Sequence, residues 1–448
     1  MTTSTQNSRR VDELVRQMTE IHPPDRGSES ELRRFIELYR ALPDAERIVF
    51  FGRLLAEFEV KRSVLDAQLA ILQKLGDVDA STFSRRLTEL RRAIESPRRR
   101  AYRKFLNASG GLKFLLDFRA DIIAARRRTE TDLEPLDEEI AHQFISWFQQ
   151  GLMYVEEISV NSSYRAIQFI AKHELVHPMT NIEEMSRRLG ADRCCFALYH
   201  RAMPEEPVVF IEVALTNGIA RSIHDVIGEE ATTQAASGTP DSAIFYSINN
   251  AQNGLAGLGL GKVLIFWVVE LLRRDRPAIK NFATLSPIPA FWKHYLKPIL
   301  EGEAHQFKLK PSRVVEFFSE RGERELLTRC QQLTGSAPCD LPQALLRALS
   351  DPAWIDDEVY CRVLRKPLRD IVYHYLTAEH DSQGQSLNQV ANFHLGNGAT
   401  VSINDVNFGA NRWPRGIESS CGVMVNYIYS SSLINKIGRT VQSLFGAT

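Results

Sequence analysis

The chain has 448 residues, too many for one ordinary hydrophobic core, so we expect two or three domains. It carries 55 basic and 55 acidic side chains, and 44% of its residues are hydrophobic. This balance excludes bulk electrostatic attraction to nucleic acid or to an anionic membrane, so an anionic ligand must be held by a local site. The longest apolar run, 263–269, is far shorter than the roughly 20 residues that a membrane-spanning helix needs.

Residues up to about 170 have the pattern of helices almost throughout. Ser28 and Glu31 form a predicted capping box, and apolar residues follow it at helical spacing. The same periodicity predicts helices within 49–58, 64–75, 83–94, 112–125 and 140–152. We therefore predict an antiparallel helical bundle as the first domain, residues 1–170.

Arginines are concentrated between Arg85 and Arg103 within this first domain. The arginines fall on one helical face, because the apolar residues of the stretch share the other. These apolar residues are Leu87, Leu90, Ala93 and Ile94. Because the chain has no net charge, we interpret this as a solvated face or a subunit contact rather than an RNA site.

After residue 175 the pattern changes to short strands mixed with helices. We expect a helix from about 261 to 274 and further helices within 341–377. The expected strands are 193–200, 208–215, 243–248, 279–285, 390–393 and 400–403. The second domain, residues 171–448, is therefore predicted to be an α+β domain interrupted by a helical insertion.

Six cysteines are scattered along the chain, and none forms a C-x-x-C pair or a zinc-binding spacing: Cys194, Cys195, Cys330, Cys339, Cys361 and Cys421. Unpatterned cysteines suit a reducing compartment. No secretory signal precedes the first helical segment, and the last residues are not a peroxisomal address. We expect a cytoplasmic protein with no bound metal.

A glycine-rich segment, 252–262 (QNGLAGLGLGK), lies between a predicted strand and a predicted helix. Glycines let backbone N–H groups approach a ligand closely, and a helix N-terminus adds unsatisfied donors and partial positive charge. The segment can therefore hold a pyrophosphate, or it can be a plain tight turn. It is neither a Walker loop nor a good dinucleotide fingerprint, because it lacks the G-K-[ST] ending and the acidic residue about 20 positions on.

The spacing Gly259-Leu260-Gly261 resembles the acetyl-CoA-binding loop of the GCN5-related N-acetyltransferase fold. That fold usually has Gln or Arg three residues before the first glycine, where this chain has Ala256. The general signature is thus only partly met.

Four further segments make a more specific resemblance. In chain order they are 243–248 (AIFYSI), 285–291 (LSPIPAF), 392–399 (NFHLGNGA) and 420–427 (SCGVMVNY). In this order and at these separations, they are similar to the malonyl-CoA decarboxylase family over essentially the whole chain.

The resemblance implies a helical domain used in oligomer contacts, as a homo-dimer or tetramer, and a catalytic domain related to those acetyltransferases. It implies decarboxylation of malonyl-CoA to acetyl-CoA and CO2 without a cofactor or metal. Ser286 and His394 match the family's catalytic residues. The matching CoA-binding loop consists of Ala256, Gly257, Leu258, Gly259, Leu260, Gly261 and Lys262.

The chemistry needs few groups, because loss of CO2 leaves charge on the thioester oxygen and a proton must then reach C2. One placed hydrogen-bond donor is typically worth ~3–4 kcal/mol of such a barrier. Ser286 stands before Pro287, which restricts it to extended backbone, and we expect its hydroxyl to position the carboxylate or the thioester carbonyl. His394 is the expected proton donor to C2, since histidine titrates near neutral pH.

Three residues near the end of the described motifs are expected to support substrate binding: Asn426, Tyr427 and Tyr429. Strand-core packing is an equally good interpretation of the tyrosines, because alternating residues point to opposite faces. Two other functions remain open, namely transfer of an acetyl group from CoA to an amine, and CoA binding without catalysis. The first would need an acceptor groove, which nothing in the sequence marks.

Overall fold

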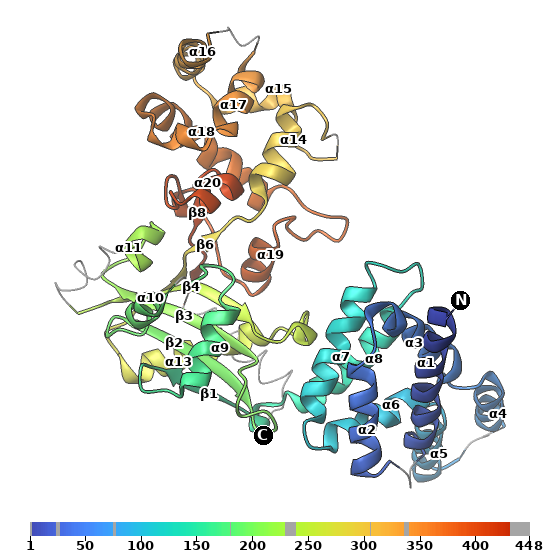
Figure 1. Ribbon diagram of the computed structural model, residues 1–448. Coiled ribbons are helices and arrows are strands. Elements are labelled where there is room, and N and C mark those ends of the chain that lie inside the picture. The colour runs from blue at the N-terminus through green and yellow to red at the C-terminus, as the bar shows by residue number, and fades with distance from the viewer. Residues whose placement is uncertain are drawn as a thin grey trace.

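The computed structural model describes residues 2–23, 27–74, 78–179, 181–228, 239–304, 306–335 and 340–430. Helices α1 to α8 form a first domain that lies beside a larger α/β domain (Figure 1). These helices are α1 (Thr2–Ile21), α2 (Glu29–Arg40), α3 (Asp44–Glu57), α4 (Arg62–Gln73), α5 (Ala80–Ala93), α6 (Pro97–Asn107), α7 (Gly111–Ala125) and α8 (Glu134–Trp147). The expected helical bundle is confirmed for this part of the chain.

Aromatic side chains hold the helical domain together. Tyr39 of α2 lies between Phe114 and Phe118 of α7, with ring centroids 5.6 and 4.9 Å away. Such pairs contribute about 0.5–1.5 kcal/mol each beyond their buried area. The capping box that begins α2 is also confirmed, because Ser28 N donates to Glu31 Oε2 over 2.6 Å.

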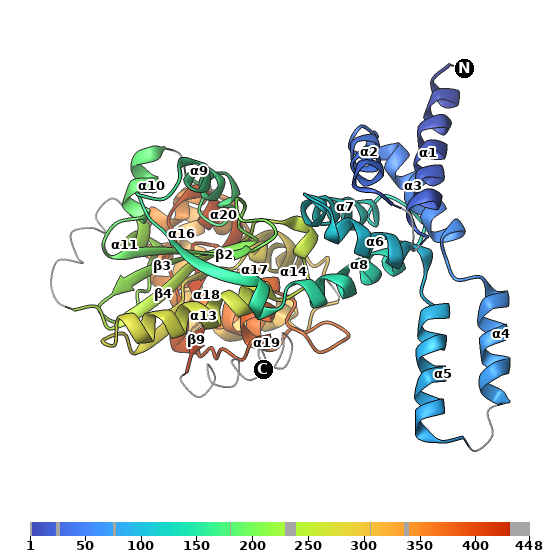
Figure 2. The ribbon, with the colours of Figure 1, turned by 90° about the horizontal axis from the view of Figure 1, so that it is seen from below.

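Helices α4 and α5 project from the rest of the domain as a hairpin (Figure 2). Neither helix has a buried side chain. The arginines of α5 are solvated, as expected, but Arg98 of α6 is only 2% exposed. It is buried because Glu139 and Glu59 pair with its guanidinium and the Leu54 carbonyl accepts a hydrogen bond from it. The prediction of a solvated face is therefore wrong for this arginine.

A six-stranded sheet, ordered β1-β2-β3-β4-β5-β9, forms the centre of the second domain. The strands are β1 (Met153–Ile158), β2 (Arg193–His200), β3 (Val209–Thr216), β4 (Ser242–Asn250), β5 (Asn281–Thr284) and β9 (Ile428–Tyr429). Neighbouring strands are antiparallel except β4 and β5, which are parallel. The helical expectation is wrong for β1, whose pairing from Met153↔His200 to Ile158↔Cys195 makes it the edge of this sheet.

Helices cover both faces of the sheet (Figure 2). Side chains alternate along β2, so Cys195, Ala197 and Tyr199 pack in the cluster beneath α9 (Tyr164–His173) and α10 (Ile182–Arg188). Cys194, Phe196 and Leu198 belong to the main core, which includes α13 (Leu260–Asp275) on the opposite face. The same domain also contains a short helix, α11 (Ile223–Ile227), and the 3-10 turns η1 (Gln150–Leu152) and η2 (Asn253–Leu255).

The predicted helical insertion follows β5 and packs against a small sheet of order β6-β8-β7. Its strands are β6 (Ser286–Pro287), β7 (Val406–Asn407) and β8 (Met424–Val425). Its helices are η3 (Trp292–Leu296), α14 (Lys297–Leu300), α15 (Pro311–Val314), η4 (Val315–Phe317), α16 (Glu320–Thr334), α17 (Leu341–Ser350), η5 (Pro352–Asp356), α18 (Glu358–Thr377), α19 (Gln389–Gly396), η6 (Ile403–Asp405) and α20 (Pro414–Ser420). Within the described residues, no helix is long and apolar enough to cross a membrane.

Two strand predictions in this region are wrong. Residues 390–393 belong to helix α19, because Asn388 caps its first turn by accepting from Ala391 N over 3.0 Å. In 400–403 only Thr400 forms a bridge, with Ile428, and the chain then turns through η6.

The helical domain contacts the α/β domain at the glycine-rich segment. Arg119 of α7 is 5% exposed, and its Nη1 donates to the carbonyls of Gly254 and Ala256 over 2.6 and 3.0 Å. Asp137 of α8 holds the same guanidinium through its Nε at 2.6 Å. A Cβ at Gly254 would lie 2.0 Å from the Leu116 backbone oxygen, so glycine lets α7 approach this closely.

Replacing Gly254 with alanine is therefore expected to destabilise the protein by about 1–3 kcal/mol, since the contact would have to open. The matched control is Gly52→Ala in α3, where a Cβ meets nothing within 4 Å and is expected to stabilise slightly. Urea unfolding followed by tryptophan fluorescence measures both. Equal midpoints for Gly254→Ala and the parent would contradict the close approach.

Candidate active site

A cavity of about 530 Å³ lies where β4 and β5 separate. The two strands pair only from Ser242↔Asn281 to Phe245↔Thr284, so β4 continues beyond the pairing from Tyr246 onward. The chain then leaves the sheet at Leu285, whose N–H donates to the Phe245 carbonyl over 3.0 Å. We call this space the central cavity; its walls are β4, the glycine-rich segment, β6 and α19.

Ser286 lies in the wall of the central cavity and is 5% exposed. Its backbone pairs with Val425 of β8, which fixes the direction of the hydroxyl. Its Oγ donates to Thr284 Oγ1 over 2.9 Å and lies 3.4 Å from Nε2 of His394. The two residues proposed from sequence, 108 positions apart, therefore meet.

His394 reaches the central cavity from α19 and is 4% exposed. Helical spacing places Val390 and Phe393 in the same wall. Its Nδ1 lies 2.9 Å from the Tyr429 hydroxyl, and its ring stacks on Tyr427 with centroids 4.7 Å apart. The two tyrosines thus lie behind the histidine and set its position rather than lining the cavity.

The imidazole of His394 is neutral at physiological pH. Burial lowers its pKa from 6.5 to about 3, because its surroundings disfavour the charged ring. Burial also raises the pKa of the Tyr429 phenol above its ordinary value, so that hydroxyl keeps its proton. A neutral ring carries a single N–H, and the hydroxyls around it can accept from one nitrogen and donate to the other.

The glycine-rich segment forms the mouth of the central cavity. Gly257 and Gly259 have φ of +80° and +70°, a conformation in which other residues are strained by roughly 1–2 kcal/mol. Gly259 caps the N-terminus of α13. A Cβ at Gly261 would lie 3.2 Å from Cζ of Phe393, so this glycine lets α13 pack closely against α19. The mouth thus combines glycine backbone, which a ligand can approach closely, with the N-terminus of α13.

The other predicted binding residues do not all line the central cavity. Leu260 lines the central cavity, whereas Ala256, Leu258 and Lys262 lie outside its lining. Asn426 is 1% exposed, and its amide donates to the Thr284 and Ala220 carbonyls over 2.6 and 3.0 Å. Its oxygen accepts from Asn407, so this side chain is fully used within the fold.

Sequence reasoning missed three residues that shape the site. Thr284 accepts from both Ser286 and the Tyr427 backbone N–H, and its position two residues before Ser286 on one strand face was a usable signal. Arg119 holds the glycine-rich segment from another domain, which no local pattern indicates. His177 is 6% exposed in the wall of a second cavity.

This architecture defines a class of protein: a mixed α/β domain with a ligand cavity at the split in its sheet and a glycine-rich helix start at the mouth. The family description "Malonyl-CoA decarboxylase C-terminal domain" matches residues 151–441, and "Malonyl-CoA decarboxylase N-terminal domain" matches 58–148. The chain belongs to the malonyl-CoA decarboxylase family.

Individual relatives agree. The mitochondrial malonyl-CoA decarboxylase of Mus musculus is 31% identical over 412 residues, covering 90% of this chain and 80% of that protein. The crystal structure of malonyl-CoA decarboxylase from Rhodopseudomonas palustris superposes with a TM-score of 0.75 at 27% identity, over 97% of this chain and 96% of that one. The structure from Agrobacterium vitis gives the same TM-score and identity, over 98% and 100%.

The buried neutral histidine predicts how stability depends on pH. Below pH 6.5 the unfolded chain protonates His394 while the folded chain does not, so this group's contribution to stability falls as pH falls toward 3. Between pH 7.5 and 5.0 the loss is about 2 kcal/mol. His394→Gln is therefore expected to lose less stability than the parent on acidification, as measured by urea unfolding at pH 7.5 and 5.0.

The matched control is His380→Gln, because His380 is exposed on a loop. This variant is expected to follow the parent at both pH values. If His394→Gln also paralleled the parent, the ring would be charged in the folded protein.

Proposed function

We propose that this chain decarboxylates malonyl-CoA to acetyl-CoA and CO2 in the central cavity. The observation that carries the proposal is the 3.4 Å approach of Ser286 Oγ and His394 Nε2 inside a cavity whose mouth is the glycine-rich segment. Family membership supports the reaction, and the cavity supplies a site for it.

Substrate binding follows from the shape of the cavity. The backbone at Gly257 and Gly259, with the N-terminus of α13 behind it, suits the CoA pyrophosphate. The part of β4 beyond the β5 pairing, Tyr246 to Asn250, offers an open strand edge along which an extended pantetheine arm fits. The thioester then reaches Ser286 at the inner end.

The bond to break joins the carboxylate carbon to C2 of the malonyl group. As CO2 leaves, the electron pair moves into the thioester and places negative charge on its oxygen, so the thioester itself is the electron sink and no cofactor is needed. We assign Ser286 to hydrogen-bond this oxygen in place of its bond to Thr284. One such donor is worth ~3–4 kcal/mol in a site that excludes water.

Protonation of C2 completes the reaction. An imidazolium is not available, because His394 is neutral, so we assign the N–H at Nε2 as the donor and the Tyr429 hydroxyl as the group that returns a proton to Nδ1. The enolate carbon is a far stronger base than a phenolate, so this relay runs downhill. A solvent proton then reaches Nε2 while Nδ1 returns its proton to the Tyr429 oxygen, so one solvent proton per turnover restores both the phenol and the N–H at Nε2.

The first test is incubation with malonyl-CoA alone in D2O. We expect acetyl-CoA and CO2 in equal amounts, with deuterium in the new methyl group. No acetyl-CoA formation would overturn the proposal and favour either amine acetylation or CoA binding without catalysis.

Single substitutions then test the roles. His394→Ala and Ser286→Ala are each expected to lower kcat by about 100-fold or more with little change in the Kd of acetyl-CoA, because each acts in the transition state. Tyr429→Phe is expected to lower kcat by about 10-fold. In single-turnover experiments with this variant, deuterium is expected to enter the methyl group in a slow phase.

Matched controls are His380→Ala and Ser350→Ala, both exposed and remote from the central cavity. They are expected to keep parental kcat and KM. A parental kcat in His394→Ala would remove the histidine from the mechanism, and a rise in KM alone in Ser286→Ala would show that its hydroxyl only binds substrate.

For the helical domain, assigned to residues 1–170 from sequence, we propose a role in self-association as a dimer or tetramer. The support is the α4–α5 hairpin, which carries exposed apolar side chains at a density unusual for a surface: Val64, Leu65, Leu69, Ile71 and Phe83, 38–48% exposed. A second copy of the same hairpin is the simplest partner that buries them.

Light scattering after gel filtration tests this role. The parent is expected to be a dimer or tetramer, and the double variant Leu69→Glu, Phe83→Glu is expected to be smaller. The control is Leu333→Glu on α16, whose side chain is 56% exposed in the other domain. A monomeric parent, or an unchanged mass in the double variant, would contradict the proposal.

We further propose a cytoplasmic location for this chain. The described cysteines support a reducing compartment, because all are free and most are buried: Cys194, Cys195, Cys330, Cys361 and Cys421. Cys339 lies outside the described residues. Among the described side chains, no group of three or more His, Cys, Asp or Glu could hold a metal ion.

A further inference from the structure

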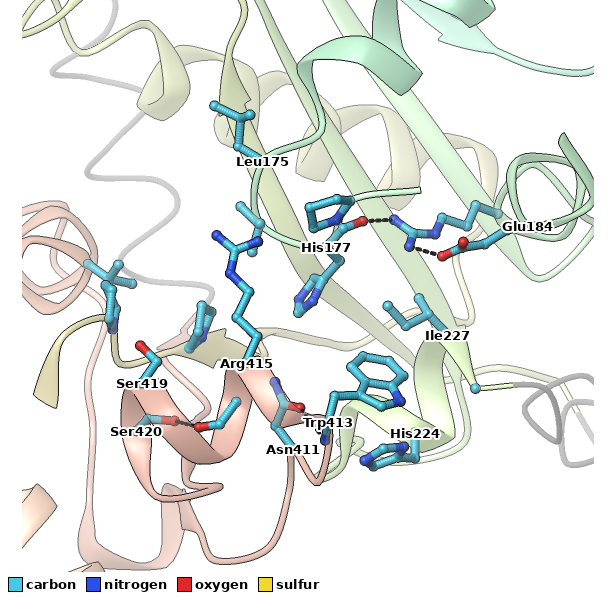
Figure 3. Close-up of a pocket in the computed structure, with 18 of the residues that line it drawn as sticks. Leu175, His177, Glu184, His224, Ile227, Asn411, Trp413, Arg415, Ser419 and Ser420 are labelled. Carbon is cyan, nitrogen blue, oxygen red and sulfur yellow. Dashed lines mark hydrogen bonds and ion pairs between the residues drawn. The ribbon is translucent and has the colours of Figure 1, made fainter. Parts of the chain in front are cut away.

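A second and larger cavity, of about 880 Å³, lies on the other side of β6 from the central cavity. Its walls are residues 175–178 and 181–188, α11, and the loop and helix 411–420 (Figure 3). We call it the basic chamber. It shares Val176, Pro287 and Val390 with the central cavity, so the two spaces adjoin next to Ser286. Its volume is ordinary for a small-molecule site.

Positive charge dominates the lining of the basic chamber. Three arginines, Arg187, Arg188 and Arg415, face a single lining carboxylate, Glu184. That carboxylate is already used, because it pairs with Arg188, which also lies 3.3 Å from Glu212. Arg187 and Arg415 form no side-chain hydrogen bond or ion pair with any described residue. The chamber is therefore complementary to an anion.

A buried polar atom points to a ligand in the same place. His177 is 6% exposed in the wall of the chamber, yet its Nε2 has no hydrogen-bond partner. Buried polar atoms are normally paired, because an unmade hydrogen bond costs roughly 1–3 kcal/mol. Figure 3 shows the His177 ring and the Arg415 guanidinium reaching into one space from opposite walls.

The backbone around His177 is held rigidly. Its N–H donates to Glu174 Oε1 over 2.7 Å, and its carbonyl accepts from Arg188 Nη1 over 2.8 Å. The backbone that carries the ring is thus fixed before any ligand arrives, which lowers the cost of ordering this segment on binding. Burial, with the charges of Arg188 and Arg415, lowers the pKa of this ring to about 3, so it is a neutral hydrogen-bonding group.

We propose that the basic chamber is a carboxylate-binding site in which Arg415 supplies the charge and His177 Nε2 a second hydrogen bond. A planar guanidinium matches a carboxylate in geometry as well as in charge. Two sources present this chemistry: the carboxylate of the malonyl group itself, entering past Val176 and Pro287, or a free dicarboxylate. The first source rests on the proposed function, and the second does not.

Binding experiments separate the two sources, with Arg415→Gln as the test variant. Arg415 is exposed, so its replacement leaves the core intact, and Arg412→Gln is the matched control because Arg412 lies three residues away outside the chamber lining. Calorimetry with malonate, and with malonyl-CoA and acetyl-CoA in the His394→Ala background to prevent turnover, gives the dissociation constants.

If the substrate's own carboxylate binds here, Arg415→Gln raises the Kd of malonyl-CoA by about 10- to 100-fold and leaves that of acetyl-CoA unchanged. In the active background it raises KM without lowering kcat, because the carboxylate loses its charge as the C–C bond breaks and the contact is therefore weaker in the transition state than in the bound substrate. If a free dicarboxylate binds, Arg415→Gln abolishes malonate binding in the presence of saturating acetyl-CoA and leaves the Kd of malonyl-CoA unchanged.

Parental affinities for both malonate and malonyl-CoA in Arg415→Gln would overturn the proposal. His177→Phe keeps a ring in the wall and removes Nε2, and it is expected to weaken the same ligand by about 3- to 10-fold. These constants are read from binding alone, so a parent that failed to release CO2 would refute the proposed function without deciding the role of the chamber.

Discussion

The separation of β5 from β4 is the constraint on which the rest of the catalytic domain depends. Pairing ends at Phe245↔Thr284, because the next residues of the chain cross to a second small sheet with β8. One strand therefore ends beside an open edge of the other, and the gap becomes a cavity instead of a continuous sheet. Ser286 and the two tyrosines behind His394 lie where the chain passes between the two sheets. The geometry of the site therefore follows from these crossings.

Burial without a charged partner gives the site its chemical character. His394 contacts aromatic rings and hydroxyls, and no carboxylate in the described part of the chain stabilises its charged form, so it remains a neutral hydrogen-bond partner. In such surroundings each hydrogen bond to a developing negative charge is stronger than in water. A reaction that only needs charge placed on an oxygen and a proton placed on a carbon is well served by neutral donors held in place by the fold.

The helical domain contributes to this arrangement from a distance. Arg119 extends from α7, is held by Asp137 of α8, and hydrogen-bonds two carbonyls of the glycine-rich segment. Buried charge-assisted bonds of this kind restrict a loop that its own glycines would leave mobile. The first domain thus carries the exposed α4–α5 hairpin and also supports the mouth of the central cavity.

The sequence was enough to predict the helical periodicity of the first domain, most strands of the sheet and the strand–loop–helix unit around Gly259, and to propose Ser286 and His394 as site residues. These follow from local patterns and from motifs that the family shares. Residues 390–393 were predicted as a strand because a four-residue stretch is too short to show a helical period, and the Asn388 cap decided for a helix. β1 was missed because strands at an edge depend on the partner beside them. Three features required the tertiary structure: the neutral state of His394, the hydrogen bonds from Arg119 to the glycine-rich segment, and the basic chamber. Each depends on burial and on contacts between residues far apart in the chain.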